Sequence, residues 1–149
     1  MIRIKTVDKQ NLLNVCKLTT IQDRMPMAAE GHLCCNAFFI AEAKYHPEMY
    51  PNAIYQNNVP IGFFLYQRTE QQPDTATICR FMLDDRFRKK EIETAAFAHI
   101  LRGLKIQGVK KVIFLAGNGN EHAKNLCLSF DFHFTGEMDQ AGFHYQLEL

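Results

Sequence analysis

The chain has 149 residues, with 17 basic and 16 acidic side chains and a formal net charge of +1. This length predicts one domain over residues 1–149, and the balanced charge excludes a strong field that would attract nucleic acid or an anionic membrane. Five cysteines without a C-x-x-C pair, and the lack of a signal-like or spanning apolar run, predict a soluble protein of the reducing cytoplasm.

The N-terminal third predicts one strand followed by two helices. Residues 2–6 alternate apolar and polar side chains as a half-buried strand does, and Asp8 is a candidate N-cap for a helix over 9–18. A second helical pattern covers about 33–45. It ends before Pro47, because the residue that precedes a proline is disfavoured in the α region.

The middle of the chain predicts an antiparallel meander of three strands. Residues 52–56 and 59–68 flank Asn57 and Asn58, a pair that tolerates positive φ and therefore suits a tight hairpin turn. A third strand follows over 75–83.

The C-terminal half predicts the order helix, strand, helix, strand, strand. Residues 110–117 form a short continuous apolar run, typical of a strand buried on both faces of a sheet, and Asn120 offers an N-cap for the helix after it. The complete order β-α-α-β-β-β-α-β-α-β-β predicts a mixed α/β domain of about seven strands and four helices. The remaining elements are helices over 90–106 and 120–130 and strands over 132–138 and 142–149.

Three stretches carry a resemblance to a known family: KYHPEMYPNAIYQNNVPIGFFLYQ, ICRFMLDDRF and NEHAKNLCLSFDFHFTGE. They resemble segments of the Gcn5-related N-acetyltransferases (GNAT), and within that family the bacterial diamine and polyamine (spermine/spermidine) acetyltransferases. The resemblance covers nearly the whole chain. It implies the acyl-CoA N-acyltransferase fold, a mixed and mostly antiparallel sheet that is splayed between its fourth and fifth strands and flanked by helices.

The resemblance also implies a reaction. Acetyl-CoA would lie in the splay as co-substrate, and a small amine, di- or polyamines first, would attack the thioester directly. A homodimer is usual among similar proteins. The alternative is a GNAT-fold protein with impaired catalysis that binds a ligand or a partner.

The resemblance places the cofactor pyrophosphate at the start of the helix after the fourth strand, where free N–H groups and the helix dipole favour an anion. The family pattern Q/R-x-x-G-x-G/A maps onto Arg88, Glu91 and Glu93, so glutamates stand at both glycine positions. A carboxylate about 5 Å from a phosphate charge costs roughly 0.8 kcal/mol in water and roughly 3 kcal/mol at an effective dielectric of 20. Alternatively, the two acids simply complement the helix dipole. The implied cofactor-binding residues are Phe81, Met82 and Leu83 through their backbone, then Arg88, Lys89, Lys90, Glu91, Ile92, Glu93, Asn120 and Lys124.

The resemblance implies a catalytic position at Cys127, where the family commonly has a tyrosine that protonates the departing thiolate. A thiol with a pKa near 8.5 is able to donate a proton. The alternative is that Cys127 is a small buried apolar side chain. The turn after this helix reads Phe130-Asp131-Phe132 and lacks the family's glycine, which predicts a turn of different shape.

Four tyrosines lie on segments that the resemblance places beside the acceptor amine. Aromatic rings suit a polyamine through cation–π contacts, although such tyrosines are more often packing residues. These implied substrate-binding residues are Tyr45, Tyr50, Tyr55 and Tyr66.

Two further motifs favour structural interpretations. Gly117, Asn118 and Gly119 connect a strand to a helix, but a nucleotide-binding G-x-G-x-x-G would need glycine at His122, so a flexible connection is favoured. The sequence His32-Leu33-Cys34-Cys35 has no partner cluster at zinc spacing, so no metal site is predicted.

Overall fold

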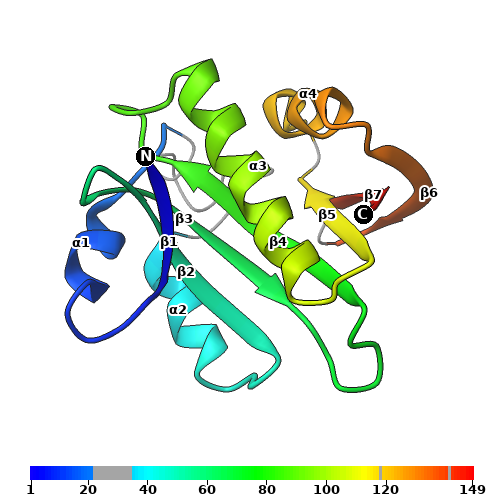
Figure 1. Cartoon of the computed structure of the whole chain (residues 1–149), viewed down its shortest axis with the longest axis horizontal. Helices are drawn as coiled ribbons and strands as arrows, with labels where there is room; N and C mark the ends of the chain where they lie inside the picture. Colours follow the sequence, from blue (N-terminus) through cyan, green and yellow to red (C-terminus); the bar gives the residue numbers. More distant parts are fainter. Residues whose placement is uncertain (22–34, 118, 141) are drawn as a thin grey trace.

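The computed structural model describes residues 1–21, 35–117, 119–140 and 142–149. Its strands are β1 (Ile2–Thr6), β2 (Met49–Gln56), β3 (Val59–Gln67), β4 (Thr75–Leu83), β5 (Lys111–Ala116), β6 (His133–Asp139) and β7 (Gly142–Glu148). Its helices are α1 (Leu12–Lys17), α2 (Asn36–Ala43), α3 (Lys90–Ile106) and α4 (Glu121–Ser129). Within the described ranges, one seven-stranded sheet has the order β1-β2-β3-β4-β5-β7-β6 (Figure 1). The order of elements and the mixed, mostly antiparallel sheet confirm the predicted fold class.

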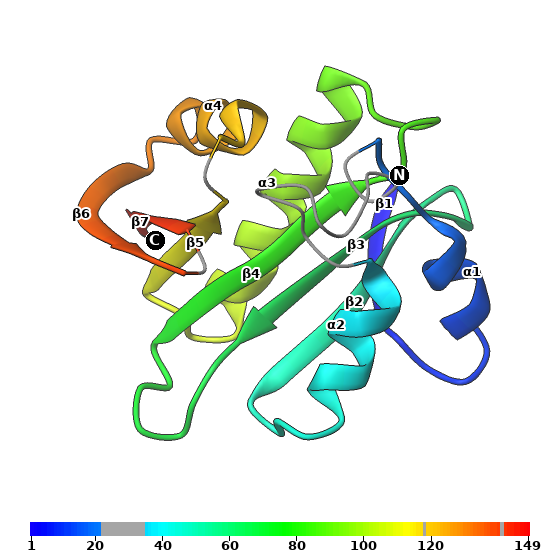
Figure 2. The ribbon, with the colours of Figure 1, turned by 180° about the vertical axis from the view of Figure 1, so that it is seen from behind.

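The helices divide between the two faces of the sheet. Helices α3 and α4 cover the face seen in Figure 1, and α1 and α2 cover the face seen in Figure 2. Each face buries its own apolar cluster: Phe97 of α3 belongs to the first cluster, and Val15 of α1 and Ile40 of α2 belong to the second. The sheet is therefore the middle layer of three. No helix in the described part of the chain is long and apolar enough to cross a membrane.

Two helices differ in extent from the sequence prediction. Helix α1 starts only at Leu12, because the carboxylate of Asp8 accepts hydrogen bonds from the N–H groups of Gln10 and Asn11 and so caps the preceding turn. Helix α2 ends at Ala43, short of the predicted end, and residues 33 and 34 of the prediction lie outside the described ranges.

The predicted hairpin is confirmed, with φ of 49° at Asn57 and 68° at Asn58. Strand β2 nevertheless begins at Met49, earlier than predicted. Proline is tolerated at Pro51 because β1 pairs with residues 52–56 of this strand, so Pro51 lies beyond the last β1 pair.

The turn after α4 keeps a helix-ending geometry without glycine. Asp131 takes a φ of 65°, a left-handed conformation that Asp adopts more readily than most residues. The N–H of Phe132 donates to the carbonyl of Cys127, and the N–H of Asp131 donates to that of Leu128, which together form a Schellman motif. A carboxylate-bearing residue therefore fills the conformational role that glycine usually has at this position.

The sheet opens between β4 and β5. These strands pair in parallel only from Thr75 to Ile78 and from Lys111 to Phe114, although both continue further. Where β4 pairs with β3, Leu65 faces Arg80 and Tyr66 faces Ile78, so Cys79 is the extra residue of a β-bulge. Beyond the bulge β4 stays paired with β3 but diverges from β5 (Figure 2).

Candidate functional site

A cavity of about 480 Å³ lies where β4 and β5 diverge. One wall is the second half of β4, from Cys79 to Leu83, and the other runs from Phe114 at the end of β5 into the first turns of α4. Thr20, in the segment after α1, lines it as well. The cavity combines apolar walls with a few polar side chains, which is usual for a small-molecule site.

Beyond Ile78, no described strand pairs with β4 on its β5 side, so this edge of β4 faces the cavity. The N–H of Asp84 donates to the carbonyl of Ile61 in the β3 direction, at 2.8 Å. Because peptide groups alternate along a strand, Met82 also directs its N–H and C=O toward β3, while Phe81 and Leu83 direct theirs toward the open edge. Phe81 and Leu83 can therefore hydrogen-bond an extended ligand that lies beside β4.

The start of α3 contributes helix N–H groups to the cavity, and Arg88, just before the helix, contributes a positive charge. Its N-cap residue, Lys89, makes no side-chain cap, so the first N–H groups of the helix are not satisfied by a capping side chain. Arg88 lines the cavity, and its Nη2 lies 3.6 Å from Oδ1 of Asp85. Of the implied cofactor-binding residues 88–93, Arg88 and Glu93 line the cavity. Lys89, Lys90, Glu91 and Ile92 do not line it.

Glu93 and His122 form a pair across the cavity that the sequence did not predict. Nε2 of His122 lies 2.6 Å from Oε2 of Glu93, and both residues line the cavity. Sequence reasoning treated His122 only as the residue that interrupts a glycine motif. The two residues are 29 positions apart on different helices, so no local pattern links them.

Asn120 lies at the wall between two cavities. Its side chain caps α4 by accepting a hydrogen bond from the N–H of Ala123 at 3.1 Å, which confirms the predicted cap. It lines the large cavity and a second cavity of about 310 Å³. Lys124 lines only the second of these, beside the aromatic rings of Phe134 and Tyr145.

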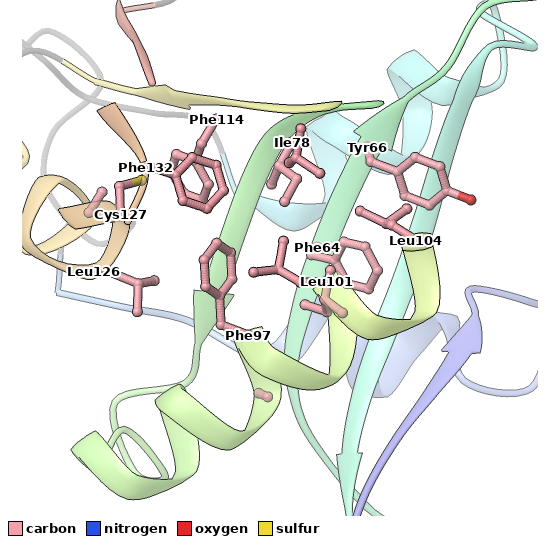
Figure 3. Packing of buried hydrophobic residues seen from close by; sticks show 14 of the residues in the cluster. Phe64, Tyr66, Ile78, Phe97, Leu101, Leu104, Phe114, Leu126, Cys127 and Phe132 are labelled. Carbon is pink, nitrogen blue, oxygen red and sulfur yellow. The ribbon is translucent and has the colours of Figure 1, made fainter. Parts of the chain in front are cut away.

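Cys127 lies in the core. The residue is 0% exposed, and burial raises the pKa of its thiol to about 12. Figure 3 shows its side chain among buried residues that include Leu126 and Phe132, and it does not line the cavity. This placement favours the alternative that Cys127 is a packing residue.

Only two of the four candidate tyrosines are brought together. Tyr50 and Tyr66 stack with ring centroids 5.0 Å apart, and Nζ of Lys5 lies 5.1 Å from the ring centroid of Tyr55. Tyr45 is 83% exposed beyond the end of α2. None of the four lines the large cavity, so a contact between these tyrosines and an acceptor stays a prediction.

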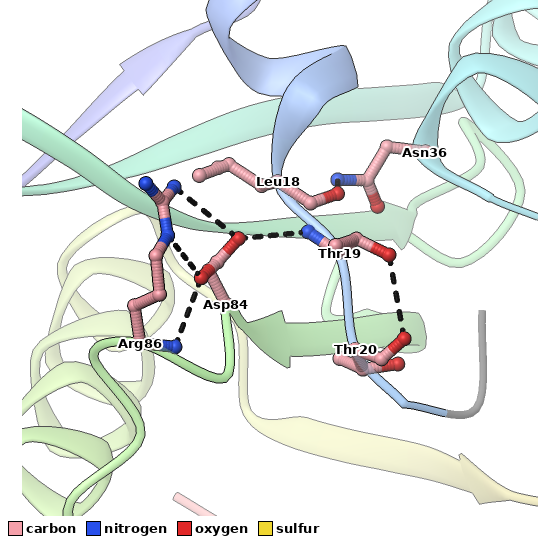
Figure 4. A network of polar contacts seen from close by, with 6 residues as sticks. All are labelled: Leu18, Thr19, Thr20, Asn36, Asp84 and Arg86. Carbon is pink, nitrogen blue, oxygen red and sulfur yellow. Dashed lines mark hydrogen bonds and ion pairs between the residues drawn. The ribbon is translucent and has the colours of Figure 1, made fainter. Parts of the chain in front are cut away.

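Asp84 anchors the segment after α1 beside the cavity. Its buried carboxylate accepts hydrogen bonds from the backbone N–H of Thr19 at 2.9 Å and from the backbone N–H and Nε of Arg86 at 2.9 and 2.8 Å (Figure 4). Burial by itself raises the pKa of Asp84, but the hydrogen bonds from Arg86 and Thr19 outweigh it and hold the pKa below its ordinary value. The ionised carboxylate therefore binds the backbone of Thr19, the residue before Thr20 at the cavity wall.

We expect Asp84→Asn to lower the free energy of unfolding by about 1–3 kcal/mol at pH 7, because the amide cannot satisfy all three donors. The stabilisation from ionised Asp84 is fully present above its pKa in the unfolded chain and is lost as the pH falls through the lower native value. Urea unfolding at pH 7 and pH 3 should show the gap between the native protein and the variant narrowing in acid. Asp74→Asn, at an exposed position, is the control and should change stability little. A gap that stays constant between the two pH values would contradict the assigned ionisation.

The sequence matches the acetyltransferase (GNAT) family over residues 17–132. No curated protein matches the chain. Several solved structures share its fold at low sequence identity. PaiA N-acetyltransferase from Thermoplasma acidophilum in complex with coenzyme A has a TM-score of 0.72 and 12% identity, with 100% of this chain and 99% of that one covered. The ribosomal-protein-S18-alanine N-acetyltransferase from Escherichia coli has a TM-score of 0.69 and 16% identity, with 99% of this chain and 94% of that one covered. YncA from Salmonella typhimurium with its cofactor acetyl-CoA has a TM-score of 0.69 and 15% identity, with 99% of this chain and 94% of that one covered.

Proposed function

The chain belongs to the acetyltransferase (GNAT) family, and on this basis we propose that it transfers an acetyl group from acetyl-CoA to a small amine. The observation that carries the proposal is the cavity between the open edge of β4 and the first turns of α3 and α4. Structures of similar fold that contain coenzyme A or acetyl-CoA support this choice of co-substrate.

We propose that the cofactor lies along β4 with its pyrophosphate at the start of α3. Backbone N–H groups at the start of this helix and the guanidinium of Arg88 would bind the phosphate oxygens. The peptide groups of Phe81 and Leu83 at the open edge would pair with the amides of the pantetheine arm. Asn120, on the opposite wall, is close enough to the same space to contact that arm.

In the proposed reaction a neutral amine attacks the thioester carbonyl, a C–N bond forms, the C–S bond breaks, and the amine proton passes to water. The buried Cys127 thiol does not protonate the leaving group in this scheme. A thiol has an ordinary pKa near 8.5, so a thiolate is already a competent leaving group near neutral pH. Losing a positioned acid costs about 10²–10⁴-fold in rate, which slows the reaction without abolishing it.

The acceptor belongs first to the diamine and polyamine class, because the sequence resemblance points to that branch. We further propose a homodimer, to be measured by light scattering on the purified protein. A second function, a GNAT-fold module that binds a ligand without turnover, is favoured by two specific features: the glutamates Glu91 and Glu93 at glycine positions and the buried Cys127.

Calorimetric titration of acetyl-CoA and a parallel thermal melt test the proposal. We expect a dissociation constant in the micromolar range, and a ligand at 100 times that constant should stabilise the native state by about 2.7 kcal/mol. Release of free thiol on addition of spermidine would then demonstrate transfer. Binding without turnover across an amine screen would favour the binding module, and no binding at millimolar acetyl-CoA would reject the enzyme.

A further inference from the structure

A polar contact crosses the large cavity between the first turns of α3 and α4. Nε2 of His122 lies 2.6 Å from Oε2 of Glu93. The Glu93 side chain is 9% exposed, whereas that of His122 is 55% exposed. The carboxylate is thus enclosed within the cavity wall, and the imidazole that contacts it still reaches solvent.

The surroundings of this carboxylate favour an anion from several directions. Glu93 lies in the first turn of α3 and His122 in the first turn of α4, so the positive ends of two helix dipoles face the contact. Arg88 lines the same cavity and adds a guanidinium. The same groups that stabilise the carboxylate of Glu93 would stabilise a phosphate.

We propose that Glu93 acts as an internal substitute for a phosphate group, and that His122 is a ligand-binding residue. When the cofactor enters, one of its phosphates would replace the Glu93 carboxylate as the partner of His122. This inference rests on the proposed function and extends it. Two anions at one position repel each other, so Glu93 competes with the cofactor and sets the affinity of the site.

The test compares coenzyme A with pantetheine, which has the same arm but no phosphate. Glu93→Gln keeps the size of the side chain and removes its charge, and it should bind coenzyme A about tenfold more tightly than the native protein does. His122→Gln should bind it about tenfold more weakly. Pantetheine should bind all three proteins equally. Glu70→Gln is the control, because it removes the same charge from an exposed position that does not line the cavity, and its affinity for coenzyme A should match that of the native protein.

The titrations distinguish a failure of this inference alone from a failure of the proposed function. Native protein that binds coenzyme A, with no gain in Glu93→Gln, overturns the inference and leaves the proposed function intact. An equal gain for pantetheine also overturns it, because the effect would then be steric. If neither the native protein nor any variant binds coenzyme A at millimolar concentration, the proposed function and this inference fail together.

A second test measures the response of the native chain itself. In protein with ring-labelled histidine, coenzyme A should shift the imidazole resonances of His122, assigned through the His122→Gln variant. Pantetheine should leave them in place. A His122 signal that does not respond to bound coenzyme A would contradict the exchange of partners.

Discussion

Replacing Phe97 by alanine should lower the free energy of unfolding by about 3–5 kcal/mol. The residue is 0% exposed, and its ring lies 4.9 to 5.9 Å from four other aromatic rings. Those rings come from β4, β5 and the segment that follows α4, and they are Phe81, Phe114, Phe130 and Phe132. The truncation leaves a void where α3 packs against both β4 and β5 (Figure 3). Urea unfolding measures the loss in the free energy of unfolding.

Ile106→Ala is the matched control for Phe97→Ala. It lies on the same helix but is 80% exposed, so we expect a change of no more than about 0.5 kcal/mol. Similar losses in the two variants would show that the helix responds to any shortened side chain rather than to the aromatic cluster.

Filling the cavity from α4 should abolish cofactor binding. Ala123 is 8% exposed and lines the large cavity, so Ala123→Phe would project a ring into the space proposed for the cofactor. We expect the affinity for acetyl-CoA to fall about 100-fold or more, equivalent to about 2.7 kcal/mol. Calorimetric titration measures this loss, and a thermal melt establishes that the variant is folded, since overpacking can itself cost about 1–3 kcal/mol.

Leu128→Phe provides the control for the filled cavity. It adds an aromatic ring to the same helix at a side chain that is 48% exposed and outside the cavity lining. Its acetyl-CoA affinity should match that of the native protein. Unchanged affinity in Ala123→Phe would mean that the ligand lies elsewhere, and the proposed cofactor position would have to be abandoned.

The sequence predicted most of the architecture because its signals were local. Alternating side chains marked β1, a continuous apolar run marked β5, Asn57-Asn58 marked the hairpin, and Asn120 marked the start of α4. The predicted helix over 9–18 was wrong at its start, because Asp8 was read as a helix cap and instead caps a turn. Aspartate caps helices and also stabilises tight turns, so the residue type and its spacing alone did not separate these two possibilities at Asp8.

The candidate site was harder to predict because it depends on which faces meet in space. The resemblance pointed to Arg88 and Glu93, and both line the cavity. The resemblance implied a catalytic position at Cys127, whereas the alternative reading of a small buried apolar side chain agrees with its place in the core. A helix repeats every 3.6 residues, so a small difference in packing changes which side chains face a cavity. The contact between Glu93 and His122 joins two helices through the fold, and the sequence carries no sign of it.

The short ladder between β4 and β5 also has a consequence for the order of folding. Strands β2, β3 and β4 are joined by short connections, so their pairing closes small loops and has a low entropic cost. Pairing Thr75–Ile78 with Lys111–Phe114 first requires the whole crossover through α3 to be in place. We therefore expect the meander to form early and the parallel ladder late, so that the opening in the sheet is completed only in the final steps of folding.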